Sequence, residues 1–134
     1  MAAGTSPIFP NVPIIGIANV SGQSAVTTRT PITGTTGLVQ LTATSTNGTR
    51  VDAITVKATG NSTAGLLDVW IYNGTTSFLY DEIAYATVTA NTTTSSNVAT
   101  ATYTTLTLPP TYQLYVSQQV VSNLSLIHIS EPTR

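Results

Sequence analysis

Four acidic residues are the main candidates for chemistry in the body of this chain: Asp52, Asp68, Asp81 and Glu82. Asp68 and Asp81 lie on neighbouring predicted strands, where two carboxyl groups could act as the general acid and base of a hydrolase. Acids on a solvent-facing surface, or paired with Arg50 or Lys57, explain the same positions. We favour the second interpretation, because exposed or paired acids are the ordinary case.

Other catalytic and metal-binding side chains are scarce. The chain has no cysteine, and its one histidine, His128, lies among the last eleven residues. A serine triad needs an imidazole or another base within hydrogen-bond reach. Asp81 and Glu82 are neighbours in a predicted strand and should point to opposite faces, whereas calcium takes about six to eight oxygen ligands. We therefore expect no catalytic residue, no metal and no cofactor.

Four aromatic residues form the candidate interaction surface: Trp70, Tyr72, Phe78 and Tyr80. They lie on both strands of a predicted hairpin. Exposed aromatic side chains there could stack on sugar rings or bury themselves in a protein partner. Aromatic packing between strands inside a sandwich explains the same spacing. Both interpretations stay open at the level of sequence.

The hairpin that carries these residues is the clearest predicted element, with Asn73-Gly74 as its tight turn. In residues 65–74 the two faces of a strand alternate: Leu67, Val69 and Ile71 against Asp68, Trp70 and Tyr72. Residues 77–85 divide in the same way: Leu79, Asp81 and Ile83 against Phe78, Tyr80 and Glu82.

Further strands are predicted at 14–20, 37–44, 50–59, 98–108 and 111–121, with Asn47-Gly48 as a second hairpin turn. Residues 50–59 also alternate: Ile54, Val56 and Ala58 against Val51, Ala53 and Thr55. Threonine fills 28 positions and favours strands, and no long window keeps helical spacing. The sequence predicts an all-β protein, an antiparallel β-sandwich of jelly-roll or Greek-key type.

The last eleven residues, LSLIHISEPTR (124–134), differ from the rest in composition. They resemble, over their whole length, the translation of an adapter used in transposon-based DNA library preparation. This resemblance implies environmental DNA and a gene product truncated near Asn123. We expect SLIHIS to pair at a sheet edge in place of a native strand, and His128 to have no function. The expected domains are an extended arm (1–13), the sandwich (14–123) and a non-native tail (124–134).

The charge balance excludes electrostatic binding of nucleic acid. The net charge is -1, and only Arg29, Arg50 and Lys57 precede the tail, whereas phosphate binding depends on clustered cations. The sequence shows neither a secretory signal nor an apolar run long enough to span a membrane. We expect a protein made in a host cytoplasm.

A pattern of strands and turns runs through residues 51–89: KATG, the small-residue turn NSTAG, an apolar strand, Asn73-Gly74-Thr75, and L-x-D-E-I at Leu79 to Ile83. A later segment, LPPTYQLYV, covers 108–116. Together they resemble a family of small tailed-phage virion proteins. Asn73 stands where the family often has aspartate, and Thr111 where it usually has glycine.

The resemblance implies a virion protein without enzymatic activity, either a capsid decoration or cement subunit or a part of the tail. Its expected partners are major capsid or tail proteins and further copies of itself, with a trimer as the natural assembly. Two alternatives remain. One is a carbohydrate-binding or adhesive module that acts through Trp70 and Tyr72, and the other is a subunit of a microbial surface filament or layer.

Overall fold

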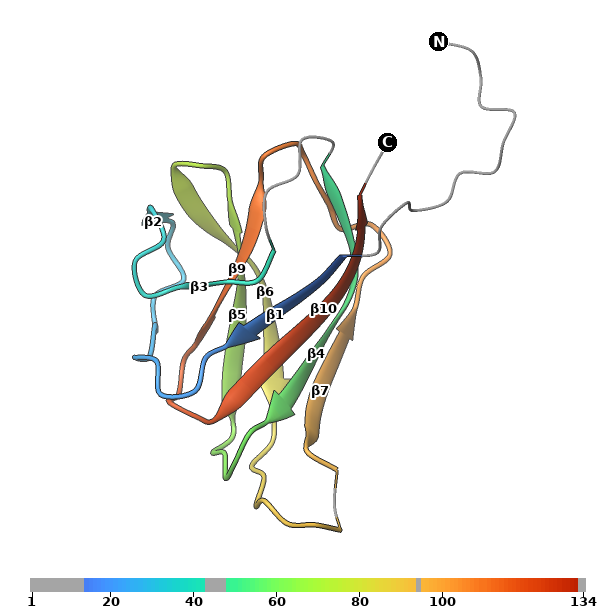
Figure 1. The fold of residues 1–134 in the computed structure, drawn as a ribbon. Coiled ribbons are helices and arrows are strands. Elements are labelled where there is room, and N and C mark those ends of the chain that lie inside the picture. Colours follow the sequence, from blue (N-terminus) through green and yellow to red (C-terminus); the bar gives the residue numbers. More distant parts are fainter. Residues whose placement is uncertain (1–13, 43–47, 94, 133–134) are drawn as a thin grey trace, which may run out of the picture.

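The protein folds as two antiparallel sheets packed face to face (Figure 1). The computed structural model describes residues 14–42, 48–93 and 95–132, with the backbone alone at 14, 15, 97 and 127–132. All regular secondary structure in these ranges is β-strand, so the predicted all-β antiparallel sandwich is confirmed. The expected arm, 1–13, and Asn47 of the expected turn lie outside the described residues.

In the described residues each sheet contains five strands. Sheet A has the order β1 (Ile14–Asn19), β10 (Leu124–Pro132), β4 (Thr49–Ala58) and β7 (Asn97–Thr102), with β8 (Thr107–Leu108) also paired to β4. Sheet B has the order β2 (Ile32–Thr33), β6 (Thr76–Tyr85), β5 (Gly65–Tyr72), β9 (Gln113–Gln118) and β3 (Val39–Gln40). The predicted strand 37–44 is thus reduced to β3 in the described residues, and 98–108 is divided between β7 and β8.

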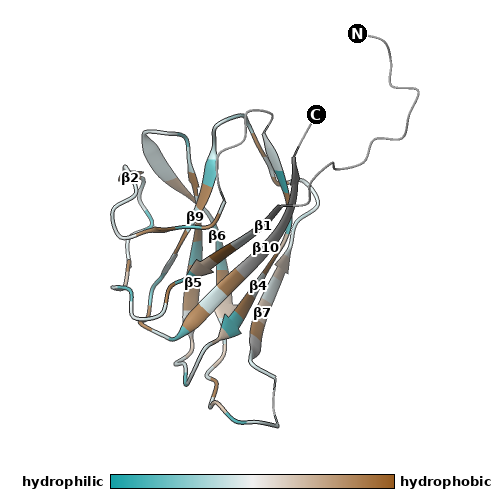
Figure 2. Cartoon of the chain, in the orientation of Figure 1, coloured by the Kyte–Doolittle hydropathy of each residue, from teal (hydrophilic) through white to brown (hydrophobic). Residues whose placement is uncertain are grey.

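The hydrophobic core lies between the two sheets. Alternate residues of each strand point into it, and Figure 2 shows hydrophobic and polar residues alternating along the described part of β10. Sheet A contributes Ile54 and Leu126, and sheet B contributes Leu67 and Leu114, all of them with 0% exposure. Since a fully buried aliphatic side chain stabilises a fold by about 1.5–3 kcal/mol, this layer is the main source of stability.

The predicted hairpin is present as β5 and β6, which pair in antiparallel register from Gly65 to Tyr72. Asn73 makes its turn: its side-chain Oδ1 accepts hydrogen bonds from the amides of Thr75 and Thr76, at 2.9 and 2.8 Å. Gly74 adopts φ 97°, which a residue without Cβ tolerates at little cost. The dipeptide signal therefore placed this turn correctly.

Bulges in β4 and β6 contradict the predicted faces of these strands. In β4 the pairing with β10 skips Asp52, so Val51 shares the core face with Ile54 and Val56. In β6 the pairing with β5 skips Tyr80. Leu79 therefore faces the same side as Trp70. One extra residue reverses the alternation of a strand, and the two-residue period gives no sign of it.

β10 lies in the interior of sheet A, between β1 and β4, and not at an edge as expected. Its first residues, Leu124 and Leu126, are fully buried in the core. The sandwich thus continues past Asn123 to Pro132. The side chain of His128 lies outside the described residues.

Thr111 adopts a strained backbone conformation. It has φ 70°, and the amide of Tyr112 donates to the carbonyl of Pro109 at 3.1 Å, so Thr111 is the third residue of a tight turn. Glycine fits this position, because a β-branched side chain clashes with its own backbone at positive φ.

Thr111→Gly should therefore stabilise the protein by about 1 kcal/mol, the relief of strain exceeding the added freedom of the unfolded chain. Thermal unfolding followed by circular dichroism should show a melting temperature about 3–5 °C higher. The matched control is Thr105→Gly, at an exposed loop residue without positive φ, which should give no gain. A lower melting temperature for Thr111→Gly would contradict the assigned strain.

Candidate functional site

The outer face of sheet B, which points away from the core, carries fully buried side chains, among them Asp68 and Trp70. Both are on β5, between core residues Leu67, Val69 and Ile71. The expectation of a solvent-facing Asp68 is therefore wrong. Trp70 is likewise withdrawn from the candidate interaction surface, since an indole with 0% exposure cannot stack on a sugar or meet a partner protein in this conformation.

Residues 21–38, here called the cover segment, account for this burial. In Figure 1 the segment rises along the side of sheet B from the end of β1 to β2 and returns to β3. Several hydrogen bonds attach it to the sheet. The amide of Val26 donates to the carbonyl of Gln118 at 2.9 Å, and the amide of Gly34 donates to the carbonyl of Thr75 at 2.7 Å. Ser77 Oγ donates to the carbonyl of Gly34 at 2.6 Å, and Gln118 Nε2 donates to the carbonyl of Gln23 at 2.9 Å. Beneath it, Trp70 Nε1 donates to Ser117 Oγ at 2.9 Å.

Asp68 belongs to a pair of carboxyl groups under the cover segment. It lies directly opposite Glu82 of β6, so both side chains share the outer face. Gln119 Nε2 donates to both, to Asp68 Oδ1 at 2.9 Å and to Glu82 Oε2 at 2.7 Å. Arg29 of the cover segment donates from Nε to Glu82 Oε2 at 2.7 Å. We call Asp68, Glu82, Gln119 and Arg29 the carboxyl cluster.

The second oxygen of Asp68 has an unusual environment. Oδ2 is buried and has no hydrogen-bond partner. An ionised carboxylate left in this state loses its hydration without replacement, which favours the protonated form. Burial accordingly raises the pKa of Asp68 from 3.8 to about 6; the hydrogen bond from Gln119 lowers it and the negative charge of Glu82 raises it further.

The two acids that the sequence suggested as a hydrolase pair do not meet. Asp81 is opposite Val69, so its side chain points to the other face of sheet B from Asp68. It accepts a hydrogen bond from Tyr103 Oη at 2.8 Å. Burial, and then this hydrogen bond to Asp81, raise the pKa of Tyr103 well above its usual range. Asp81 and Glu82 point to opposite faces as expected. The described residues contain no group of three or more acidic or histidine side chains that could hold a metal ion.

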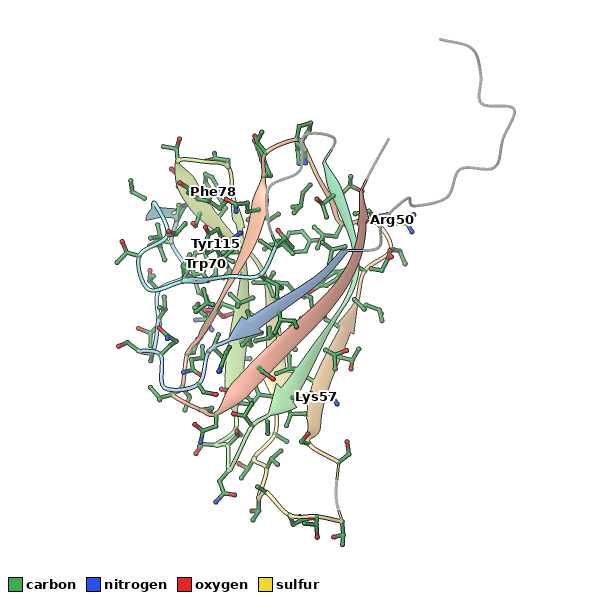
Figure 3. The ribbon with its side chains drawn as sticks, viewed as in Figure 1. Arg50, Lys57, Trp70, Phe78 and Tyr115 are labelled. Carbon is green, nitrogen blue, oxygen red and sulfur yellow. The ribbon has the colours of Figure 1, made fainter. Side chains whose placement is uncertain are left out.

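The other aromatic candidates separate into two places. Tyr72 is half-buried and packs edge-to-face against Tyr115, with ring centroids 5.5 Å apart. Phe78 and Tyr80 are 45% and 44% exposed, and the ring of Tyr80 lies 6.0 Å from that of Tyr103. Tyr115 is opposite Trp70 and Phe78 is opposite Ile71, and Figure 3 shows Trp70, Phe78 and Tyr115 on the sheet B side of the molecule. Phe78 and Tyr80 thus remain as accessible candidates, and we call them, with Tyr103, the β6 aromatic patch.

The remaining charged and concave features are modest. Arg50 forms an ion pair with Asp52 at 3.1 Å, which agrees with the interpretation of the acids as partners of basic residues. Figure 3 shows Arg50 and Lys57 toward opposite ends of β4. A pocket of about 110 Å³ lies beside the turn after β4 and is lined by uncharged residues, among them Thr59, Val88 and Asn91.

Sequence reasoning missed Arg29 and Gln119 as members of the carboxyl cluster. Arg29 is 53 positions from Glu82, and Gln119 is 51 positions from Asp68. A single sequence carries no local signal for contacts at such separations. The one available hint was the unusual presence of Asp68 in an otherwise apolar strand.

Comparison of the chain with protein-family models finds no match, and comparisons with curated proteins and with solved structures find none either. Within the part of the chain that the structure describes, there is no helix with the length and apolar character needed to cross a membrane.

Proposed function

We propose that the protein is a structural subunit of a phage particle without enzymatic activity, a capsid decoration or cement subunit that binds a repetitive particle surface. The resemblance of residues 51–89 to small virion proteins supports this role. That block contributes β4, β5 and β6 and so supplies strands to both sheets. Its partners would be the major capsid protein and further copies of this chain.

The observation that carries the proposal is the exposure of the β6 aromatic patch. Phe78 and Tyr80 expose almost half of their surface, although most large aromatic side chains are well covered. Within sheet B, β2 pairs only with Thr76 and Ser77 of β6. The following part of β6, which carries Phe78 and Tyr80, is therefore a sheet edge. Exposed aromatic groups at an edge are typical of surfaces that bind other proteins.

A low charge supports binding by surface fit. Charged residues make up 7% of the chain, so a neighbouring subunit would meet few charges that must be desolvated. Weak contacts of this kind reach high overall affinity when copies joined to one another bind one lattice together. Binding should therefore change little with salt, since the Debye length governs only the charged contacts.

Co-sedimentation tests the proposal. The full chain is mixed with particles assembled from the major capsid protein encoded on the same DNA, at 0.15 M and about 1 M NaCl, conditions that separate screened from unscreened binding. We expect binding at both salt concentrations. The double variant Phe78→Asp, Tyr80→Asp should bind at least about tenfold more weakly, because each carboxylate would be buried without a partner.

The matched control is Thr100→Asp, which adds a carboxylate at an exposed position of β7 and should bind as the parent does. Melting curves verify that all variants are folded. Equal binding by the double variant and the parent, or no binding at saturating concentration, would refute the proposal. A secretion signal upstream in the same DNA, with no terminase, portal or capsid gene nearby, would favour a microbial surface layer instead.

A further inference from the structure

We infer that Asp68 holds a proton beside Glu82 beneath the cover segment, and that losing this proton releases the segment from the outer face of sheet B. The inference concerns the carboxyl cluster and does not depend on the proposed function.

The first step is geometric. Asp68 and Glu82 occupy directly opposed positions on neighbouring strands, and one amide nitrogen, Gln119 Nε2, donates to an oxygen of each. Two carboxylates held this close repel each other unless one carries a proton. Asp68 Oδ2 is the oxygen left without a donor. A proton placed there turns an unsatisfied acceptor into a donor that faces Glu82.

The second step is the balance of charge around the pair. The charged groups of the described residues that act on Asp68 are Glu82 from β6 and Arg29 from the cover segment. From β9 and the residue that follows it the neighbours are uncharged, Ser117 and Gln119. With Asp68 protonated, one carboxylate faces one guanidinium and the charges cancel. With Asp68 ionised, two negative charges face a single positive charge, and one of them is fully buried.

The third step connects this balance to the cover segment. Arg29 reaches Glu82 from an exposed position, with its side chain 56% exposed. Water can reach an ionised Asp68 only if the segment that buries it moves away. The segment is attached through separate hydrogen bonds at Gln23, Val26, Arg29 and Gly34 and through β2, which pairs over two residues only. Short attachments of this kind open at a lower free energy than the core does.

The raised pKa of Asp68, about 6 instead of 3.8, agrees with this picture. If the open form restores an ordinary pKa, the ratio of open to closed molecules rises tenfold for each pH unit between these two values. The ratio should therefore increase by about thirtyfold between pH 4 and pH 6, and approach a total change of about a hundredfold between more acidic and more alkaline pH. Opening would expose Trp70 beside Tyr72 and Tyr115 and so add an indole to the aromatic surface.

Hydrogen exchange of the full chain tests the inference. The amides of Val26 and Gly34 hold the cover segment, and the amide of Val51, which donates to Leu106 at 2.9 Å, reports on the core. After correction for intrinsic exchange, protection at Val26 and Gly34 should fall by up to about a hundredfold from pH 4 to pH 7. At every pH these two amides should exchange faster than Val51. Acrylamide quenching of Trp70, the only tryptophan, should rise over the same range.

Two variants complete the test. Asp68→Asn cannot ionise and keeps the shape of the side chain, so protection at the cover amides should no longer depend on pH. Glu82→Gln removes the repelling charge and should move the transition to lower pH. Equal pH dependence in Asp68→Asn and the parent would overturn the inference. So would cover amides that exchange only together with Val51, because opening would then be global unfolding. A negative result here leaves particle binding untouched.

Discussion

Leu126→Ala is expected to destabilise the protein by about 2–5 kcal/mol, because it leaves a cavity in the core between β10 and sheet B. Leu126 has 0% exposure and belongs to an interior strand of sheet A. A loss of this size is a large part of the roughly 5–15 kcal/mol that stabilises a typical domain. Chemical denaturation followed by Trp70 fluorescence measures it directly.

The matched control is Ile17→Ala on the adjacent strand β1. Ile17 is 70% exposed, so its truncation should change stability by no more than about 0.5 kcal/mol. Removal of residues 124–134 should go further and abolish cooperative unfolding, since β1 would lose its strand partner and Leu124 and Leu126 would leave the core. A chain ending at Asn123 that melts like the parent would show that β10 contributes nothing.

These expectations bear on the resemblance of 124–134 to adapter sequence. If a native continuation replaces these residues, it should fill the same position between β1 and β4, with large apolar side chains at the places of Leu124 and Leu126. The resemblance also predicts that the native continuation gives the higher melting temperature.

Asp68→Asn is expected to stabilise the protein at neutral pH. The pKa of Asp68 is raised from 3.8 to about 6 in the folded protein, so the folded state holds its proton more tightly than the unfolded state does. The contribution of this group to stability is therefore fully present below pH 3.8 and is lost as the pH rises through about 6. Since one pKa unit corresponds to about 1.4 kcal/mol, the ionised side chain costs about 3 kcal/mol at pH 7.

The asparagine variant avoids this cost, so its melting temperature should exceed that of the parent by about 8–12 °C at pH 7, and by little at pH 4. Differential scanning calorimetry at both pH values measures the difference. Asp52→Asn is the matched control, because Asp52 is only partly buried and forms a surface pair with Arg50. Its effect should stay below about 1 kcal/mol. A gain for Asp68→Asn that is equal at both pH values would exclude the ionisation of Asp68 as its cause.

Local features of the fold were predictable from the sequence because their causes are local. The two-residue period of residues 65–74 located β5 and the faces of Leu67 and Asp68, and Asn73-Gly74 located the turn to β6. The departures have causes that lie elsewhere in the chain. The positions of the bulges at Asp52 and Tyr80 depend on how β4 and β6 pair with other strands. The alternation of residues within one strand cannot show where a bulge interrupts that alternation.

The candidate site was less predictable for the same reason. A polar residue alternating with apolar ones normally faces solvent, which made Asp68 look exposed and Trp70 available to a ligand. Both are buried because a segment about forty positions earlier in the chain folds over them. The residues around Asp68 and Trp70 in the sequence do not predict this contact. Phe78 and Tyr80, whose exposure depends mainly on their own strand, stayed accessible.

The position of β10 has a consequence for biosynthesis. Of the described strands β1 is made first, yet its partner β10 is made last. Until residues 124–132 are synthesised, β4 also lacks its neighbour on that side, and sheet A has a gap at its centre. We expect the nascent chain to stay open and exposed to aggregation up to that point, to need chaperones at high expression, and to fold slowly, as proteins dominated by distant pairings do.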